Sequence, residues 1–211
     1  MTESLEAESL EAPGGELEFV RAHLAPPPAR VLEVGCGRGT LARILAADGH
    51  DVTAVDPDAP EGGIFRRETI ERHDGNGYDV VVAARSLHHV DDLDAVVDKI
   101  ARIGRRFLLA EFAWERFDAP TAAWWDERRA ALAQSDRPTA AEWASRFHHL
   151  HTAAAMREAL ARSFDERVFE WTPYLSYFLR VADDEPERAA IDRGEIAAIG
   201  FRWAGESRHE R

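Results

Sequence analysis

Apolar and polar positions along the chain divide into segments that predict strands separated by helices. Short apolar runs, typical of buried strands, occur at 29–34, 51–56, 78–84 and 105–112, and a weaker run broken by polar residues at 63–70. Between these runs, 41–49 and 91–104 carry apolar residues at helical spacing. Apolar strands joined by helices predict a parallel sheet that is covered on both faces.

The segment 91–104 gives the clearest helical pattern. Its apolar residues fall on one face, and they are Leu93, Val96, Val97, Ile100 and Ile103. We expect Asp91 to cap the start of this helix and Gly104 to end it.

Residues 113–163 interrupt the alternation with a long helical stretch rich in tryptophan. The tryptophans are Trp114, Trp124, Trp125 and Trp143, and TAAE at 139–142 resembles a capping box. These tryptophans could form an apolar lid around a bound aromatic or lipophilic molecule, but we favour the interpretation that they pack extra helices onto the sheet. Around this stretch we expect a frayed acidic tail at 1–14, a helix at 16–24, a strand at 166–171, a helix at 185–197 and a final strand at 200–204.

Charge and composition narrow the classes of partner. The 211 residues include 39 acidic and 26 basic side chains, for a net charge of −13, which disfavours binding to free nucleic acid. No apolar run approaches the roughly 20 residues needed to span a membrane, and the acidic N-terminus lacks signal-peptide features. We therefore expect a cytoplasmic protein with no membrane partner. The single cysteine, Cys36, excludes an internal disulfide and a multi-cysteine metal site.

The sequence VLEVGCGRGT at 31–40 carries the strongest chemical signal. A predicted strand runs into Gly35, Gly37 and Gly39 and then into a helix, so the backbone can approach a ligand closely. Dinucleotide-binding loops have the spacing GxGxxG, and here the third glycine comes one residue early. The acid Glu33 would repel a pyrophosphate, whereas it suits a positively charged ligand. S-adenosylmethionine, with a sulfonium and an amino group, is such a ligand.

Over residues 28–112 the sequence resembles the class I S-adenosylmethionine-dependent methyltransferases, in the branch that acts on small molecules. EVGCGRG at 33–39 is similar to the first motif of the family, and YDVVVAARSLHHV at 78–90 is similar to its fourth-strand motif. The resemblance implies S-adenosylmethionine as cofactor and places Asp56 on both ribose hydroxyls and Pro57 near the adenine. The residues implied to contact the cofactor are Glu33, Gly35, Cys36, Gly37, Gly39, Asp56, Pro57, Thr69, Ala84 and Arg85.

The sequence departs from the family pattern after the third strand. There the family usually places an acid that bonds the adenine amino group, and the candidates in this chain are Glu68, Thr69 and Ile70. We expect Thr69 or Ile70 to line the adenine pocket.

The resemblance also implies a fold and an organisation. The fold is an α/β, Rossmann-like, doubly wound and mostly parallel seven-stranded sheet with a helical insert after the fifth strand. We expect one methyltransferase domain at 15–211, with a cofactor-binding core at 28–112, an insert or lid at 113–163 and the C-terminal part of the sheet at 164–211.

The expected function is methyl transfer to oxygen, nitrogen or carbon of a small-molecule acceptor. The Asn/Asp-Pro-Pro-Tyr/Phe motif of many methylases of bases and proteins is missing after the fourth strand, where ARSLHH stands. Two alternatives remain open: a non-catalytic S-adenosylmethionine-binding or partner protein on the same fold, and a nicotinamide-dependent oxidoreductase.

Candidate catalytic residues follow the fourth strand. His88 or His89 could accept a proton from the nucleophile, or the pair could pack structurally. Arg85 could contact the cofactor carboxylate, orient an acidic substrate or form a surface ion pair.

Other polar residues have more open roles. Glu111 could bind a substrate group or serve local structure. HHLH at 148–151 could line the acceptor pocket, although its spacing does not predict a metal site and none is expected. Cys36 lies where a helix N-terminus could lower a thiol pKa, but we expect no catalytic role for it.

Overall fold

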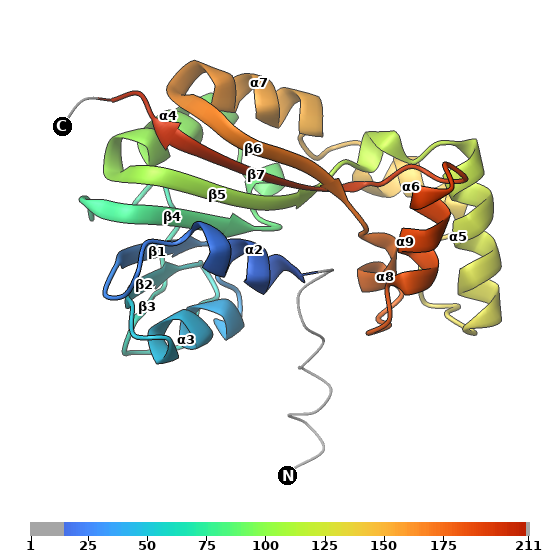
Figure 1. The fold of residues 1–211 in the computed structure, drawn as a ribbon, viewed down its shortest axis with the longest axis horizontal. Helices are drawn as coiled ribbons and strands as arrows, with labels where there is room; N and C mark the ends of the chain where they lie inside the picture. The colour runs from blue at the N-terminus through green and yellow to red at the C-terminus, as the bar shows by residue number, and fades with distance from the viewer. Residues whose placement is uncertain (1–14, 210–211) are drawn as a thin grey trace, which may run out of the picture. The chain divides into compact units, whose positions relative to one another are not determined.

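The computed structural model describes residues 15–209; the expected acidic tail at 1–14 lies outside the described residues, as do 210–211. Seven strands form one sheet in the order β3-β2-β1-β4-β5-β7-β6 (Figure 1). The strands are β1 Arg30–Val34, β2 Asp51–Val55, β3 Phe65–Arg66, β4 Tyr78–Ala84, β5 Gly104–Phe112, β6 Phe164–Thr172 and β7 Gly200–Ser207.

The first five strands are parallel, and the last two are not. Registered parallel pairs join β2 to β3, β1 to β2, β1 to β4 and β4 to β5. Between β6 and β7, Asp165 pairs with Arg208, Arg167 with Glu206, and Glu170 with Arg202, so residue numbers rise on one strand as they fall on the other. These two strands are antiparallel, and the prediction of a mostly parallel, Rossmann-like seven-stranded sheet is confirmed.

The helices lie in segments that were predicted to be helical, with some changes in length, except the helix at 175–178, which the sequence analysis did not predict. They are α2 Glu16–His23, α3 Thr40–Ala47, α4 Leu93–Ile103, α5 Ala119–Ala131, α6 Ala140–Phe147, α7 Ala153–Ser163, α8 Leu175–Phe178 and α9 Glu185–Asp192, with single 3₁₀ turns at η2 Leu87–His89 and η3 Trp114–Arg116. Helix α9 is shorter than the predicted 185–197, because Gly194 adopts a φ of +70° just beyond its end. The third strand is also shorter than predicted, because the chain turns after Arg66, with Glu68 N–H bonded to the Arg66 carbonyl.

Helix α4 confirms its predicted apolar face and corrects its predicted cap. Leu93, Val96, Val97, Ile100 and Ile103 are all buried. The prediction that Asp91 caps the helix was wrong: Asp92 is the N-cap, and its side chain accepts a hydrogen bond from Ala95 N–H at 3.0 Å. A capping side chain reaches the N–H of the third helical residue, and counting from Leu93 that residue is Ala95.

The described residues group into two compact units, treated separately below. We call residues 19–111, 151–170 and 202–209 the sheet unit, and residues 15–18, 112–150 and 171–201 the helical unit. The predicted insert at 113–163 is divided between them, since α5 and α6 belong to the helical unit and α7 to the sheet unit.

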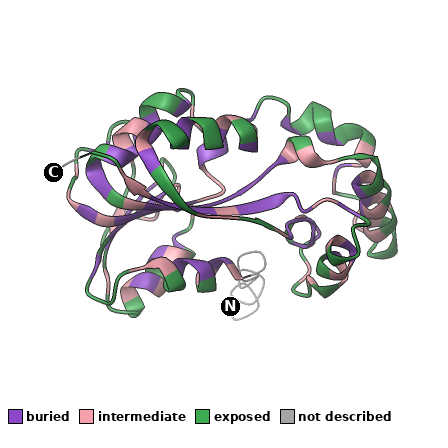
Figure 2. Cartoon of the chain, turned by 45° about the horizontal axis from the view of Figure 1, so that its top comes forward, coloured by how far each residue is buried: buried purple, intermediate pink, exposed green. Residues whose placement is uncertain are grey.

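The core of the sheet unit lies along β1, β4 and β5, which are mostly buried, and the middle of the sheet appears largely purple in the burial view (Figure 2). Val31, Ala54 and Val80 from three neighbouring strands pack with Ala42 and Leu45 of α3. The apolar face of α3 therefore holds the helix that follows the glycine loop against the sheet.

The helical unit has an aromatic core of its own. Trp125 and Trp143 are fully buried, and their indole N–H groups donate to the carbonyls of Pro138 and Trp114 at 2.8 and 3.1 Å. Phe112 stacks on Tyr174 at 5.1 Å between ring centroids. These tryptophans thus pack inside the unit with their polar atoms satisfied.

Candidate active site

The three glycines after β1 are needed for different reasons. Gly35, Gly37 and Gly39 all have positive φ, at 72°, 50° and 77°. A Cβ on Gly35 would lie 2.2 Å from the Cβ of Ser86, and one on Gly39 would lie 2.2 Å from the ring of Phe65. A Cβ on Gly37 would meet nothing within 4 Å. The outer glycines therefore permit close packing, while the middle one borders open space where a ligand can approach the backbone.

The glycine loop is tied to the end of β2 by hydrogen bonds. Gly35 N–H donates to the Val55 carbonyl at 2.8 Å, and Gly37 N–H donates to Asp56 Oδ2 at 2.9 Å. The other oxygen of Asp56, Oδ1, accepts from Asp58 N–H at 2.8 Å. Each carboxylate oxygen has capacity for a second hydrogen bond, so this anchored carboxylate can still bind a pair of hydroxyls.

Negative charge gathers around Cys36 in the same loop. Burial raises the pKa of the Cys36 thiol to about 12, and the charges of Glu33 and Asp56 raise it as well. The thiol is therefore protonated and unreactive near neutral pH, although a helix N-terminus alone would have the opposite effect. Glu33 itself is buried on β1, two residues before Gly35.

The turn after β4 lies against the glycine loop. Ser86 Oγ donates to the Val34 carbonyl at 2.9 Å, which joins this turn to the end of β1. On the other side, Ala84 is in register with Ala110, and Arg85 N–H donates to the Ala110 carbonyl at 2.8 Å. Arg85 has a φ of +56°, a strained conformation for a non-glycine residue at the carboxyl edge of the sheet.

His88 and Glu111 form a buried pair between the ends of β4 and β5. His88 Nδ1 lies 2.5 Å from Glu111 Oε2, while Glu111 Oε1 accepts from Leu87 N–H at 2.8 Å. An ionised carboxylate only accepts, so Nδ1 carries the proton. His89 is exposed, and its ring lies 4.1 Å from that of His88 between centroids. The sequence left two roles open for Glu111, and these contacts show that it fixes the 3₁₀ turn.

The HHLH segment lies at helix junctions. His151 follows α6 and donates from Nε2 to the Val90 carbonyl at 2.7 Å, while its backbone N–H donates to the His88 carbonyl at 3.2 Å. His148 caps the end of α6 and, with the exposed His149, belongs to the helical unit. Within residues 15–209, no group of three or more His, Cys, Asp or Glu side chains could hold a metal ion.

In the segment after β3, Thr69 is more accessible than Ile70, the other residue expected to line the adenine pocket. Glu68 Oε1 lies 2.7 Å from His73 Nδ1, and His73 Nε2 lies 2.9 Å from the Tyr78 hydroxyl, so the Glu68 carboxylate is used locally. Ile70 is buried, whereas Thr69 is half-buried and Pro57 is exposed.

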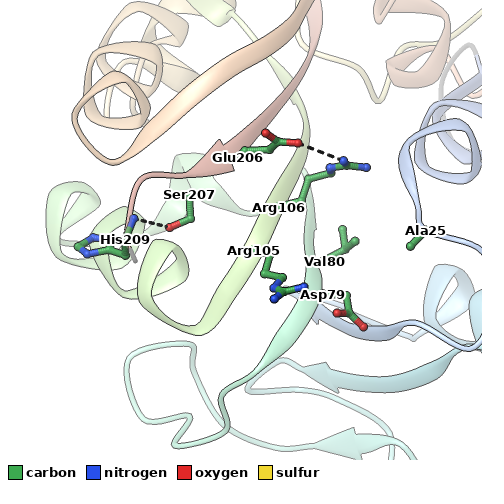
Figure 3. A pocket seen from close by; sticks show the side chains of 8 residues that line it. All are labelled: Ala25, Asp79, Val80, Arg105, Arg106, Glu206, Ser207 and His209. Carbon is green, nitrogen blue, oxygen red and sulfur yellow. Dashed lines mark hydrogen bonds and ion pairs between the residues drawn. The ribbon is translucent and has the colours of Figure 1, made fainter. Parts of the chain in front are cut away.

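A surface pocket of about 530 Å³ lies elsewhere in the sheet unit (Figure 3). It is lined at the amino ends of β4 and β5 by Asp79 and Arg106, at the opposite end of these strands from the turn at Arg85. Three of its charged groups already have partners: Arg106 contacts Glu206 at 3.3 Å, and Asp79 accepts from Arg30 N–H at 2.9 Å. This pocket is therefore not the site that the glycine loop forms.

Among the helices within residues 15–209, we find none whose length and apolar character would let it cross a membrane.

Comparison with known proteins gives matches in sequence and in fold. A family model described as a methyltransferase domain matches residues 9–171. The ubiquinone biosynthesis O-methyltransferase of Hahella chejuensis is 34% identical over 105 residues, 42% of this chain and 44% of that protein. Its counterpart in Xanthomonas axonopodis pv. citri is 34% identical over 113 residues, 44% and 47% of the two chains. The matches thus span less than half the length of these curated relatives.

Solved structures share the fold at low sequence identity. An S-adenosylmethionine-dependent methyltransferase from Mesorhizobium loti superposes with a TM-score of 0.59 and 14% identity, covering 92% of this chain and 98% of that one. Geranyl diphosphate C-methyltransferase from Streptomyces coelicolor, in complex with Mg²⁺, geranyl diphosphate and S-adenosyl-L-homocysteine, gives 0.60 and 15%, covering 91% and 79%. With the family model matching most of its length, this chain belongs to the class I S-adenosylmethionine-dependent methyltransferases.

Proposed function

We propose that the chain binds S-adenosylmethionine at the carboxyl ends of β1, β2 and β4 and transfers its methyl group to a small-molecule acceptor. The observation that carries this proposal is the pairing of Gly37 with Asp56. It places a carboxylate that retains hydrogen-bonding capacity beside backbone that borders open space. Family membership supports the same assignment.

The residues around this point fit the proposed cofactor. Asp56 would bind the ribose hydroxyls, and Pro57 and Thr69 would face the adenine. Glu33 supplies negative charge on the side of the loop where a sulfonium and an amino group would lie. Ala84 and Arg85 would close the turn over the methionine part, and the Arg85 guanidinium would bind its carboxylate. The cofactor supplies a methyl group already activated by its positive sulfur.

Proton removal from the acceptor is assigned to His89. Its ring is exposed, whereas the buried His88 is held by Glu111. As the acceptor's oxygen or nitrogen bonds to the methyl carbon, the carbon–sulfur bond breaks and its electron pair stays on sulfur. The acceptor proton then passes to the base. The names of the relatives include both O- and C-methyltransferases, so the acceptor atom is left to the assay.

Cofactor binding is tested by calorimetric titration of the purified chain with S-adenosylmethionine, S-adenosylhomocysteine and NAD. Asp56→Ala should abolish binding of both S-adenosyl ligands. Asp51→Ala is the matched control, because it removes an exposed carboxylate from the other end of the same strand. Binding of NAD alone, or equal binding by both variants, would contradict the proposed site.

Turnover is tested with a panel of hydroxyl, amine and activated-carbon acceptors. Once an O- or N-acceptor is found, His89→Ala should lower kcat by about a hundredfold or more and leave cofactor affinity unchanged. Cofactor binding without turnover of any acceptor would favour a non-catalytic S-adenosylmethionine-binding protein instead.

A further inference from the structure

The helical unit contains an arginine whose charge is poorly compensated. The Arg137 side chain is only 15% exposed, and its Nε and Nη2 are buried without a hydrogen-bond partner among the described residues. Its nearest carboxylate oxygen is Asp136 Oδ2, which lies 3.9 Å from Nε. That distance exceeds the range of a hydrogen bond, so the contact is electrostatic only.

A second arginine shares the same carboxylate oxygen. Arg180 Nη1 also lies 3.9 Å from Asp136 Oδ2, so two guanidinium groups lie next to one exposed carboxylate and neither hydrogen-bonds to it. Burial lowers the pKa of the Arg137 guanidinium, and the positive charges of Arg180 and Arg146 lower it further, while Asp136 partly opposes them. Two guanidinium groups thus lie beside a single carboxylate, which cannot fully compensate their charge.

This arrangement is unusual for the chain that contains it. Acidic residues outnumber basic ones by 39 to 26, so the chain has more than one carboxylate for each arginine. Other arginines of the helical unit do form direct ion pairs: Arg188 with Asp184 at 2.8 Å, and Arg193 with Glu195 at 2.6 Å. Arg128 and Arg129 of the same unit each bury one Nε without a hydrogen-bond partner, but among the described residues of this unit Arg137 alone buries two such guanidinium nitrogens.

The backbone at Arg180 adds an independent observation. Arg180 has a φ of +52° just after α8, with its N–H bonded to the Tyr177 carbonyl at 2.9 Å. Glycine or asparagine usually occupies such a left-handed helix end, because other side chains are strained there. An arginine side chain is kept at this position despite that cost.

We propose that Arg137 and Arg180 form a binding site for an oxyanion, such as the phosphate, diphosphate or carboxylate group of a small molecule. The planar guanidinium group matches phosphate and carboxylate oxygens in two-pronged hydrogen bonds, and convergent arginines favour a multiply charged group. The inference does not depend on methyl transfer, since every residue it uses lies in the helical unit.

The test is a titration of the full chain at low ionic strength with inorganic phosphate, diphosphate and succinate. Binding is measured by calorimetry and by changes in the NMR signals of the arginine Nε–H groups. Saturable binding of at least one anion is expected, with a shift of the Arg137 Nε–H signal. The phosphate and succinate arms distinguish the two sources of the charge.

Variants make the assignment specific. Arg180→Gln should weaken anion binding about tenfold or more, which corresponds to about 1.4 kcal/mol. The matched control Arg193→Gln, an exposed and paired arginine of the same unit, should bind as the wild type does. Arg137→Lys keeps the positive charge at a partly buried position but loses the paired N–H donors of the guanidinium group. This variant should therefore also bind the anion more weakly. Absence of saturable binding at millimolar anion, or equal affinity in Arg180→Gln and the wild type, would overturn the proposal.

Discussion

His88 Nδ1 and Glu111 Oε2 lie 2.5 Å apart, and this contact joins the residues that follow β4 to the end of β5. Both side chains are buried, and the second carboxylate oxygen accepts from Leu87 N–H. One side chain therefore accepts hydrogen bonds from an imidazole N–H and a backbone N–H inside the protein. The geometry of the turn that carries His89 depends on this carboxylate.

Replacing Glu111 with alanine should destabilise the fold substantially. It removes a buried carboxylate that accepts from Leu87 N–H and the His88 ring, at a cost of about 3 kcal/mol or more in the free energy of unfolding. Chemical denaturation measures this, with Glu158→Ala as control, an exposed carboxylate paired with Arg162 whose loss should cost under about 0.5 kcal/mol.

Glu111→Gln tests separately the contact with Leu87 N–H and the contact with the His88 ring. The amide oxygen can still accept from Leu87 N–H, but an amide nitrogen opposite His88 would favour the ring tautomer protonated at Nε2. Nitrogen NMR shifts of the His88 ring report this tautomer directly. An unchanged tautomer in Glu111→Gln would mean that another contact fixes the ring.

Gly37→Ala should fold but bind the cofactor poorly. The new Cβ meets no protein atom within 4 Å, so the cost in stability is the left-handed strain of about 1 kcal/mol. The same Cβ would project into the space assigned to S-adenosylmethionine, and affinity should fall about tenfold or more.

Gly194→Ala is the matched control for Gly37→Ala. Gly194 has a φ of +70° and equally open surroundings, but it lies in the helical unit. Both variants should lose similar stability, and only Gly37→Ala should lose affinity in calorimetry. Equal affinities would place the cofactor away from the loop.

Local sequence patterns were sufficient to predict the elements that position the site. The run ending in Gly35, the alternation through 28–112 and the apolar face of α4 each depend on neighbours within a few residues. The glycine loop could be located for the same reason. The difference between Gly37 and the outer glycines could not be predicted, because the Cβ positions of Gly35 and Gly39 are blocked by Ser86 and Phe65, which lie far along the chain.

Non-local contacts explain what the sequence did not reveal. Glu111 and His88 are 23 residues apart, and only the register of β4 with β5 brings them together. The helical unit likewise joins 112–150 to 171–201 through aromatic packing such as Phe112 on Tyr174. No short pattern encodes that association.

The cap of α4 offers a test over a single residue. Asp92→Ala should lower the free energy of unfolding by about 1 kcal/mol, because Ala95 N–H loses its acceptor. Asp91→Ala should change it by less than about 0.5 kcal/mol, since Asp91 is exposed and precedes the cap. Thermal and chemical denaturation of both variants decide between them. A larger loss in Asp91→Ala would restore the cap that the sequence predicted.

Glu187 sets two opposing effects against each other in the helical unit. Its carboxylate is fully buried and accepts from the N–H groups of Tyr174, Leu175 and Ser176 at 2.7 to 2.8 Å. Burial raises the pKa of this carboxyl above its ordinary value of 4.5, and the three hydrogen bonds only partly oppose the shift.

A raised pKa means that the folded chain holds this proton more tightly than the unfolded chain. The stabilisation that Glu187 contributes is therefore complete below about pH 4.5 and is lost as the pH rises through the folded-state pKa. Glu187→Gln removes the titrating carboxyl group. It also replaces the oxygen that accepts from Ser176 N–H with an amide N–H group, and the stability lost in this way does not depend on pH. The wild-type excess in free energy of unfolding over Glu187→Gln should then fall as the pH rises above about 4.5. Denaturation of both proteins across a series of pH values measures it. An excess that grows with pH would mean that the three backbone donors outweigh burial.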